Sequence, residues 1–521
     1  MNGIRSRLSI HDRRMQEDPG WLLHPLLHHR CGMDDRHTDG KEGIRPAVRR
    51  AMAGTWKAWR LAVLTALLWP SSAGAQDFFC LDSLMNLGLP LVMIDTVDGE
   101  EPACDYVDAP EGCQGRSITN AAKVPGRLRI LSGRDTVYDS GPYAEDLSGM
   151  TVRMRGNTSA YLVKHSLKVD LQKKADLLRR GDDTFSDKDW LLLADYPPSL
   201  NQMVGRCVSR LLGIGWTPEG REVNVVFNGL YRGIFTLSEN VKRAPQSRID
   251  VDKSTGFIIE RDPYWWNEDF YLETGWTRDT PAFKYTLKYP DSKKVTQEQA
   301  DYITGVMDRV EQSLADGTYE EYIDVYSFVL WLLAHDILGT FDAAGSNMFF
   351  TKYDSTDGSK VALGPLWDFD SIFMCEDDWS TVRWSGYFPF YDKEGRPTEF
   401  SQLYDEVLDF MCQWLFDYVV DYFDDYLRSD EAAALDKSRR YESERWVWPY
   451  VPVADDVARI RQWFLSRRDW MMRQTAVRTP ESTPVRAATV RRGCYDLYGR
   501  RLQYPSHHGW VILDGRKYYL P

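Results

Sequence analysis

The segment from residue 334 to residue 373 holds the side chains best suited to chemistry. It contains Asp342, Asn347 five residues later, and then Asp368 and Asp370 within the sequence WDFD. Phosphoryl transfer needs one carboxylate to orient and deprotonate the acceptor hydroxyl, and separate oxygen ligands for the divalent cations that neutralise the phosphates. The residue types and their order in this segment fit both tasks.

The elements around these residues are predicted to bring them together. An apolar helix ends just before a loop of small residues that holds Asp342 and Asn347. Residues 348–353 and 360–363 then form a hairpin, which returns the chain to WDFD. Protein kinases place a base and a metal-binding Asn in one loop with the spacing D-x4-N, and a metal-binding Asp just past a hairpin. Taken alone, Asp342 has the simpler explanation of a cap or turn residue at a helix end.

The rest of the chain predicts an α+β fold with two lobes. Alternating and β-branched residues predict a β-rich first lobe with strands at 89–94, 126–131, 151–155 and 166–171, then a helix at 200–212, a hairpin of 222–227 with 231–237, and a strand at 256–260. Asn228-Gly229 is the dipeptide that a type I′ hairpin turn favours. Apolar periodicity predicts a helical second lobe with helices at 296–315, 322–338, 401–427 and 453–472.

Several motifs in this order resemble the CotH kinase family of atypical, spore-coat-H-like protein kinases. They are the segments RGNTS (155–159), SLKVDL (166–171), WLLL (190–193) with Asn201, NGLYRGIFTLSENV (228–241), GFIIE (256–260), Asn347 and WDFD (367–370). The resemblance covers residues 89–473, and its most specific parts are RGN-[ST]-S, NGxYxGxFxLxE and WDFD. It implies a divergent kinase-like fold that uses ATP and Mg²⁺ or Mn²⁺ to phosphorylate Ser or Thr of proteins.

The resemblance also implies roles for residues of the second lobe. Asp342 is expected to be the catalytic base and Asn347 a metal ligand. Asp368 stands where the metal-binding Asp belongs, with Asp370 as the alternative ligand, because DFD replaces the usual DFG. The chain lacks the G-x-G-x-x-G loop, the V-A-I-K context, H-R-D and A-P-E of ordinary kinases.

The nucleotide is expected to bind to the first lobe. Arg155, Gly156 and Asn157 lie in a loop of small residues that suits contact with phosphates through backbone N–H groups and one guanidinium. Lys168 on the next strand is expected to pair with phosphate oxygens, with Lys164 as the competing choice. Glu239 is expected near the lobe junction or as a partner of Lys168. The alternatives are a simple turn, a solvated strand lysine and a surface carboxylate.

The N-terminal region predicts export. Residues 52–75 combine positive charge, the apolar run LAVLTALLW and the sequence AGA, which is the order of a signal peptide cleaved before Gln76. Residues 1–51 are then an upstream artefact or disordered, and the mature chain has no predicted transmembrane segment. We expect a kinase domain at 76–473, a linker at 474–492 and a small β module at 493–521. The protein is predicted to be periplasmic, on the cell surface or secreted.

Charge and cysteine content narrow the partners. The formal net charge of −13 argues against nucleic-acid binding, which requires a basic surface. Cys104 and Cys113 flank a polar loop and are a plausible disulfide in an oxidising compartment. The tail, with GCYDLYGRRL and GWVILDGRKYYL, resembles the sorting modules of type IX-secreted proteins of Bacteroidetes, which would make secretion machinery a partner. A plain β-hairpin cap explains the same residues.

Two other classes of function compete with a Ser/Thr kinase. One is a non-catalytic surface or scaffold protein that keeps the kinase-like fold. The other is a carbohydrate-active enzyme, which the 19 Trp residues and many acids of an exported protein would suit. Sugar hydrolysis needs paired carboxylates, but it gives no role to Asn347, Lys168 or Arg155. The order of the motifs therefore favours the kinase.

Overall fold

The fold is taken from a computed structural model of the chain. The described residues are 80–113, 115–195, 197–275, 284–343 and 347–478, together with the strand segments 494–496, 509–513 and 516–520. The predicted signal peptide, the residues before it and most of the predicted linker lie outside this set. Residues 108–116 belong to a separate compact unit, and within it Ala109 N–H donates to Gly115 O at 3.0 Å.

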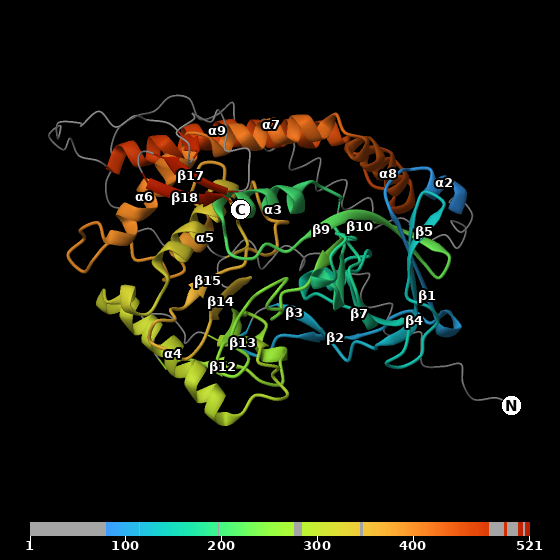
Figure 1. Cartoon of the computed structure of the whole chain (residues 1–521), viewed down its shortest axis with the longest axis horizontal. Helices are drawn as coiled ribbons and strands as arrows, with labels where there is room; N and C mark the ends of the chain where they lie inside the picture. The colour runs from blue at the N-terminus through green and yellow to red at the C-terminus, as the bar shows by residue number, and fades with distance from the viewer. Residues whose placement is uncertain are drawn as a thin grey trace. The chain divides into compact units, whose positions relative to one another are not determined.

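A closed β-barrel makes up the first part of the larger unit (Figure 1). Its strands follow the order β1-β9-β10-β8-β7-β6-β4, the pairing of β1 with β4 closes the ring, and β5 lies beside β4. The bounds are β1 (Leu91–Thr96), β4 (Val124–Ser132), β5 (Asp135–Asp139), β6 (Met150–Met154), β7 (Leu167–Ala175), β8 (Asp187–Leu193), β9 (Gly220–Phe227) and β10 (Leu230–Glu239), with β2 (Asp105–Asp108) and β3 (Arg116–Thr119) paired separately.

The interior of the barrel is packed with apolar side chains. Val152, Val169 and Val225 are completely buried in this core. Because successive side chains of a strand point to opposite faces, the residues between these positions, such as Lys168 and Arg153, point away from the barrel core. The Asn228-Gly229 prediction is confirmed, since β9 and β10 pair across it and both residues have positive φ, at 48° and 77°.

A second sheet and several helices complete this unit. The sheet has the order β12-β13-β11-β14-β15. Its bounds are β11 (Phe257–Arg261), β12 (Leu272–Glu273), β13 (Lys284–Tyr289), β14 (Met348–Lys352) and β15 (Ala362–Leu363). The helices are α2 (Leu81–Met85), α3 (Asn201–Leu212), α4 (Gln297–Asp316), α5 (Val325–Leu338), α6 (Glu399–Cys412), α7 (Leu415–Leu427), α8 (Asp430–Trp446) and α9 (Val453–Arg478). Short 3₁₀ turns are η2 (Val97–Gly99), η3 (Thr158–Tyr161), η4 (Asp183–Phe185), η5 (Trp265–Asn267), η6 (Tyr319–Glu321) and η7 (Thr381–Trp384).

Helix α5 lies in the middle of the largest hydrophobic core. Phe328, Trp331 and Leu332 are fully buried, and side chains of α3, α6, α7 and α9 belong to the same cluster. The sequence predicted this helix from an apolar run on every side. Because α5 is held so firmly, the loop that follows its C-terminus starts from a fixed point, and that loop carries Asp342.

The structure confirms a mixture of helices and strands, with three differences from the predictions. Helix α8 was not predicted at all, and α9 continues to Arg478, beyond the expected end of the helix. The expected disulfide is absent, because Cys104 and Cys113 are free thiols and Cys104 Sγ instead lies 3.6 Å from the Met154 sulfur.

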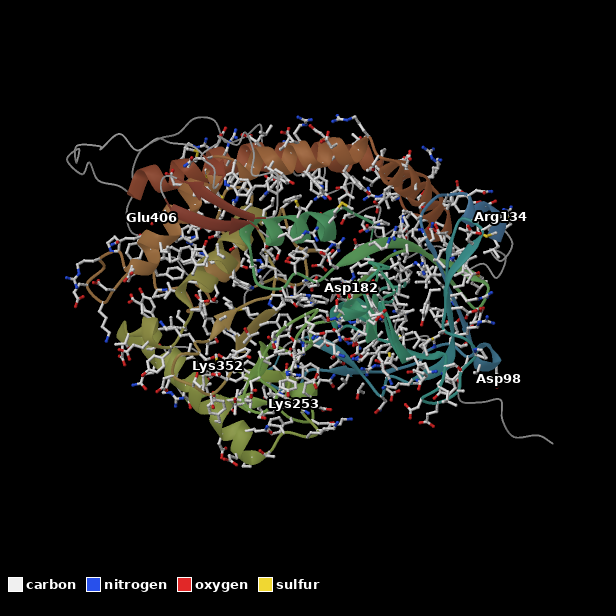
Figure 2. All side chains as sticks on the ribbon, viewed as in Figure 1. Asp98, Arg134, Asp182, Lys253, Lys352 and Glu406 are labelled. Atoms are coloured by element: carbon white, nitrogen blue, oxygen red, sulfur yellow. The ribbon has the colours of Figure 1, made fainter. Side chains whose placement is uncertain are left out.

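The described surface is polar, and the tail contains short strands. Figure 2 shows charged side chains, among them the exposed Arg134 and Glu406, projecting from the ribbon. Strands β16 (Cys494–Asp496), β17 (Gly509–Leu513) and β18 (Arg516–Leu520) form an antiparallel sheet. Within the described residues, none of the helices has both the length and the apolar character needed to cross a bilayer.

Candidate functional site

Asp342 lies in the loop that follows α5, beside the segment that follows WDFD. Gly339 ends the helix in the left-handed conformation, at φ 57°. Two residues of the loop then bond to Ser371: Phe341 N–H donates to its carbonyl oxygen at 3.1 Å, and Asp342 N–H donates to its hydroxyl oxygen at 2.9 Å. The carboxylate of Asp342 is exposed. Ser371 therefore fixes the backbone of Asp342 while leaving its side chain accessible.

A buried network anchors the same loop from the other side. Asp336, near the end of α5, is completely buried and accepts hydrogen bonds from Ser380 Oγ at 2.7 Å and from Tyr404 OH at 2.8 Å. Its second oxygen also pairs with Arg383 Nη1 at 2.5 Å. Because every bond of this network is charge-assisted, the end of α5 and the segment around residue 380 are tied firmly together.

Asn347 and Asp368 come together as the sequence predicted. Asn347 directly precedes β14, and its Nδ2 donates to Asp368 Oδ2 at 3.4 Å. The hairpin of β14 and β15 leads the chain back to Asp368, which is half-buried. Burial is the first cause that raises the pKa of Asp368 well above its usual value, and the carboxylates of Asp370 and Asp342 raise it further.

Asp370 belongs to the same acidic cluster. Its side chain keeps an exposed surface, yet enough protein surrounds it that burial is the main cause of its raised pKa, with the charge of Asp342 acting in the same direction. The carboxyl groups of Asp368 and Asp370 also bond to each other. The structure thus gathers Asp342, Asp368 and Asp370, together with Asn347, at one place.

Arg155 is the cation that acts on this cluster. It follows β6, and its N–H donates to Ser166 O at 3.0 Å, which fixes the start of its loop. Burial lowers the pKa of the guanidinium, while the negative charges of Asp368 and Glu260 oppose that shift. The positive charge of Arg155 in turn lowers the pKa of Asp368. The charge of the barrel loop therefore acts on the WDFD segment, although the two are far apart in the sequence.

The neighbours of Arg155 shape the loop. Gly156 has φ 110°, and a Cβ at this position would lie 2.4 Å from Ser159 Oγ, so only glycine fits. Asn157 Oδ1 accepts a hydrogen bond from Ser117 Oγ at 2.6 Å. Of the three residues predicted to contact nucleotide in this loop, Arg155 is the one whose charge acts on the acidic cluster.

Lys164 has structural partners for all of its donors. Its Nζ donates to the carbonyl oxygens of Asp195 and Ile234, and it pairs with Glu442 Oε1 of α8 at 2.6 Å. Both side chains of the ion pair are fully buried. An ammonium group has three hydrogens, so these three acceptors satisfy it and leave none for a phosphate.

Lys168 and Glu239 do not pair with each other. Lys168 lies on the outer face of the barrel, where its Nζ is 3.0 Å from Asp189 and 3.4 Å from Asp170. Glu239 is buried and pairs with Arg180 at 3.0 Å, while burial raises the pKa of its carboxyl group. The partnership expected between Lys168 and Glu239 is therefore wrong, because the two residues bond to different groups.

Residues missing from the predicted site also contribute to it. Glu260, at the end of β11, accepts a hydrogen bond from the backbone N–H of Asn347 and pairs with Lys288 at 2.7 Å. Together with Ser371, it holds the backbone on both sides of the acidic cluster. The available signal was the position of Glu260 as the last residue of the motif GFIIE, but a strand-terminal carboxylate by itself does not indicate what it contacts.

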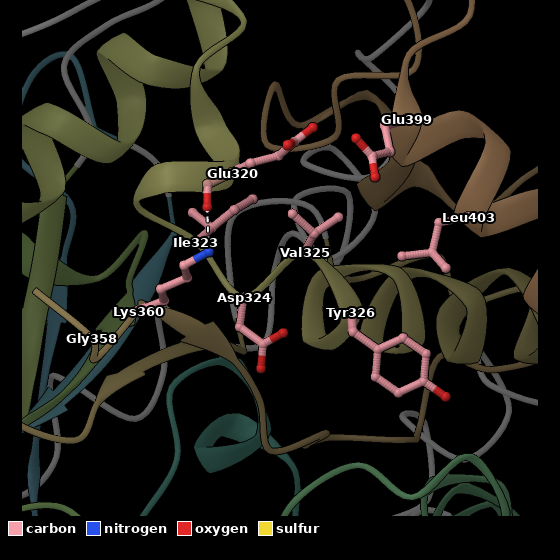
Figure 3. Close-up of a pocket in the computed structure, with 9 residues that line it drawn as sticks. All are labelled: Glu320, Ile323, Asp324, Val325, Tyr326, Gly358, Lys360, Glu399 and Leu403. Carbon is pink, nitrogen blue, oxygen red and sulfur yellow. Dashed lines mark hydrogen bonds between the residues drawn. The ribbon is translucent and has the colours of Figure 1, made fainter. Parts of the chain in front are cut away.

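A cavity of about 500 Å³ lies elsewhere, at the N-terminal end of α5 (Figure 3). Figure 3 shows Glu320 and Glu399 on one side of it, with Asp324 and Tyr326 opposite. Asp342 follows the other end of α5, and a helix of 14 residues is roughly 21 Å long at 1.5 Å per residue. The cavity is therefore separate from the acidic cluster.

The acidic cluster suits a divalent cation held together with a phosphate-bearing ligand. Within the described part of the chain, no group of three His, Cys, Asp or Glu side chains forms a metal site by itself. Mg²⁺ is usually bound by only one or two carboxylates plus substrate phosphates, and it prefers oxygen ligands. Asp368, Asp370 and the amide oxygen of Asn347 provide such ligands, and burial first, then the neighbouring carboxylates Asp370 and Asp342, raise the pKa of Asp368.

Comparison with known proteins gives two findings. The model of the family described as CotH kinase protein matches residues 152–471, which is more than half of the chain. Among solved structures, the chain is similar to the crystal structure of the Helicobacter pylori proinflammatory kinase CtkA, at 10% identity and a TM-score of 0.22, over 60% of this chain and 95% of that one. No curated protein matches the chain.

Proposed function

Since the chain belongs to the CotH kinase protein family, we propose that it transfers the γ-phosphate of ATP to a Ser or Thr hydroxyl of another protein. The observation that carries the proposal is the meeting of Asp342, Asn347 and Asp368 with Arg155, which comes from a distant loop. A base, oxygen ligands for a cation and a cation for phosphate are the parts that phosphoryl transfer requires.

Each residue has a definite task in this reaction. The exposed carboxylate of Asp342 orients the acceptor hydroxyl and takes its proton as the oxygen attacks the γ-phosphorus; the bond to the bridging oxygen breaks, and ADP leaves. Asp368, Asp370 and Asn347 would hold a divalent cation, which neutralises the phosphate oxygens when it is bound. Arg155 would donate hydrogen bonds to phosphate oxygens.

We further propose a two-lobed arrangement and export. The barrel would form the nucleotide lobe and the helices around α5 the lobe that receives the protein substrate, with the acidic cluster and Arg155 at their junction. The predicted signal peptide at 52–75 and the acidic composition support a role outside the cytoplasm. N-terminal sequencing of the protein recovered from its native host is expected to start at Gln76; a start at Met1 or Met52 would contradict export.

The test of the proposed activity is transfer of label. Full-length protein would be incubated with γ-labelled ATP, Mg²⁺ or Mn²⁺ and generic acceptor proteins, in parallel with Asp342→Asn and Asp368→Asn. Asp357→Asn is the matched control, because this exposed carboxylate lies in the turn between β14 and β15. Asp342→Asn removes the general base and Asp368→Asn a charged ligand of the cation, and each loss is expected to lower phosphate transfer by about 100-fold or more.

The outcomes separate the classes of function. If the native protein and Asp357→Asn label Ser or Thr of the acceptor protein and the other two variants do not, the kinase activity is established. Equal transfer by all four proteins would mean that the acidic cluster is not the active site. Absence of transfer by the native protein, with hydrolysis of polysaccharide in its place, would favour the carbohydrate-active alternative.

A further inference from the structure

The backbone of the WDFD segment is not stabilised by regular secondary structure of its own. Asp368 and Phe373 both have left-handed φ values, 64° and 65°, which residues other than glycine rarely adopt. The segment between β15 and Phe373 contains no helix or strand. A strained loop of this kind persists only where its surroundings determine its conformation, so neighbouring elements must fix the two carboxylates.

Helix α3 provides one support. The ring of Phe369 lies flat against Gly205, where an added Cβ would be 2.1 Å from the ring. One turn earlier on α3, Asn201 Nδ2 donates to the carbonyl oxygen of Asp370 at 3.2 Å. Residues four apart share a helix face, so the same face of α3 holds both the ring of Phe369 and the backbone of Asp370.

Helix α9 fixes the orientation of the Asn201 amide. Arg459 Nη2 donates to Asn201 Oδ1 at 2.7 Å, and Asp456 Oδ1 holds the guanidinium of Arg459 at 2.5 Å and 3.0 Å. The other oxygen of Asp456 accepts the N–H of Leu200 at 2.7 Å, at the start of α3. The start of α3 and the N-terminal part of α9 are thus joined by charge-assisted bonds.

Asparagine fits this position for a chemical reason. Arginine can only donate hydrogen bonds and a backbone carbonyl can only accept them. The residue between Arg459 and the Asp370 carbonyl must therefore accept on one side and donate on the other. An aspartate at position 201 would keep the bond to Arg459 but would set a carboxylate against the carbonyl oxygen, and an alanine would remove both bonds.

We propose that Asn201 and Arg459 are positioning residues for the acidic cluster: they hold the backbone at Asp370 and so fix the Asp368 and Asp370 carboxylates in the geometry that a cation–nucleotide complex requires. The proposal rests on the proposed function, because the same two carboxylates are the expected cation ligands. It extends the site to α9, an element that contributes no residue to the acidic cluster itself.

The test compares binding and turnover in full-length variants. Mn²⁺ affinity, with and without ATP, would be measured by electron paramagnetic resonance, together with the melting temperature and phosphate transfer. Asn201→Asp is expected to weaken binding of Mn²⁺ with ATP by about tenfold, the effect typical when a residue that supports a metal ligand is lost. Arg459→Met is expected to weaken it less, and Arg459→Lys, which keeps a donor for Asn201, is expected to restore most of it.

Arg461→Met is the matched control on the same helix. Arg461 pairs with Asp424 at the surface and has a half-exposed side chain, so its loss should leave Mn²⁺ affinity unchanged. If Arg461→Met weakens binding as much as Arg459→Met does, the effect is a general loss of α9 and the positioning role is overturned. If Asn201→Asp does not fold, the difference in Mn²⁺ affinity between Arg459→Met and Arg459→Lys still tests the positioning role.

Failure of this inference can be told apart from failure of the kinase proposal. If the native protein transfers phosphate and Asn201→Asp binds Mn²⁺ and turns over normally, positioning is refuted and the kinase stands. If Mn²⁺ with ATP binds in a manner that depends on Asn201 but no phosphate is transferred, positioning stands and the kinase fails. If the native protein binds no Mn²⁺ either alone or with ATP, both are refuted.

Discussion

The buried ion pair between Lys164 and Glu442 gives the sharpest test of the structure. Both side chains are fully buried, and the ammonium lies 2.6 Å from Glu442 Oε1. The other carboxylate oxygen of Glu442 accepts the N–H of Ile234 at 3.1 Å. The pair therefore joins α8 to the outer face of the barrel at β10. The perturbations are Lys164→Met, Glu442→Gln and the double variant.

The burial of the pair sets the size of the effect. Removing one partner of a buried ion pair leaves an unpaired charge and costs about 3–5 kcal/mol of the free energy of unfolding, whereas removing both charges together is often nearly neutral. In the double variant, glutamine keeps an acceptor for Ile234 N–H, so we expect a loss of about 1–2 kcal/mol, the price of an imperfectly satisfied polar group. The losses of unfolding free energy in the two single variants should then add up to much more than the loss in the double variant, which corresponds to a coupling energy of about 4 kcal/mol or more.

The assay is urea unfolding of the full-length chain, with the ATP dependence of transfer measured on the same proteins. Arg428 and Asp425 form an exposed pair on the surface, so a cycle of Arg428→Met and Asp425→Asn should give a coupling energy of at most about 1 kcal/mol. If Lys164→Met leaves the free energy of unfolding unchanged and raises the KM for ATP, then Lys164 is a nucleotide ligand and the structural role argued from its three acceptors is refuted.

Further predictions concern other buried groups. Burial raises the pKa of Glu311 from about 4.5 to about 7, so its stabilising contribution is complete below pH 4.5 and lost by pH 8. Between these pH values, the free energy of unfolding of Glu311→Gln, measured with urea, should rise by up to about 3 kcal/mol relative to that of the native protein. Parallel pH curves for the two proteins would contradict the assignment. Gly205→Ala should displace Phe369 and lower phosphate transfer by about tenfold or more, which retained activity would disprove. Asp336→Asn should cost about 3 kcal/mol in thermal unfolding by weakening the pairing with Arg383, and an unchanged melting temperature would argue against that network.

The parts of the fold with local signals were predictable. The β9–β10 hairpin follows from Asn228-Gly229, and α5 follows from an apolar run on every side. Helix α8 was missed because polar contacts hold it to the barrel, such as Ser438 Oγ with Asn224 Nδ2 at 3.0 Å and Glu442 with Lys164. Apolar periodicity cannot reveal a helix of which half the buried residues are polar or charged.

The sequence predicted the order of the site residues along the chain better than it predicted their contacts in space. Asp342 and Asn347 follow the end of α5, and the β14–β15 hairpin returns the chain to Asp368; both are local features. The charge of Arg155 acts on the cluster from a distant part of the sequence, whereas Lys168 faces carboxylates on the outer barrel surface. Strand alternation shows that Lys168 points away from the core, but it does not show which surface lies opposite.

The charges of the acidic cluster indicate the kind of ligand that it binds more clearly than the types of its residues do. Burial, and then the like charges of Asp370 and Asp342, raise the pKa of Asp368. Both effects work against an ionised carboxylate in the folded protein, so the cluster is more readily explained by binding than by stability. A glycoside hydrolase would need one protonated and one ionised carboxyl group on either side of a neutral sugar. Here an amide donates to Asp368, and the positive charge of Arg155 lowers its pKa. Carboxylates beside a guanidinium fit a ligand that carries both signs of charge, and a cation bound to a polyphosphate is such a ligand.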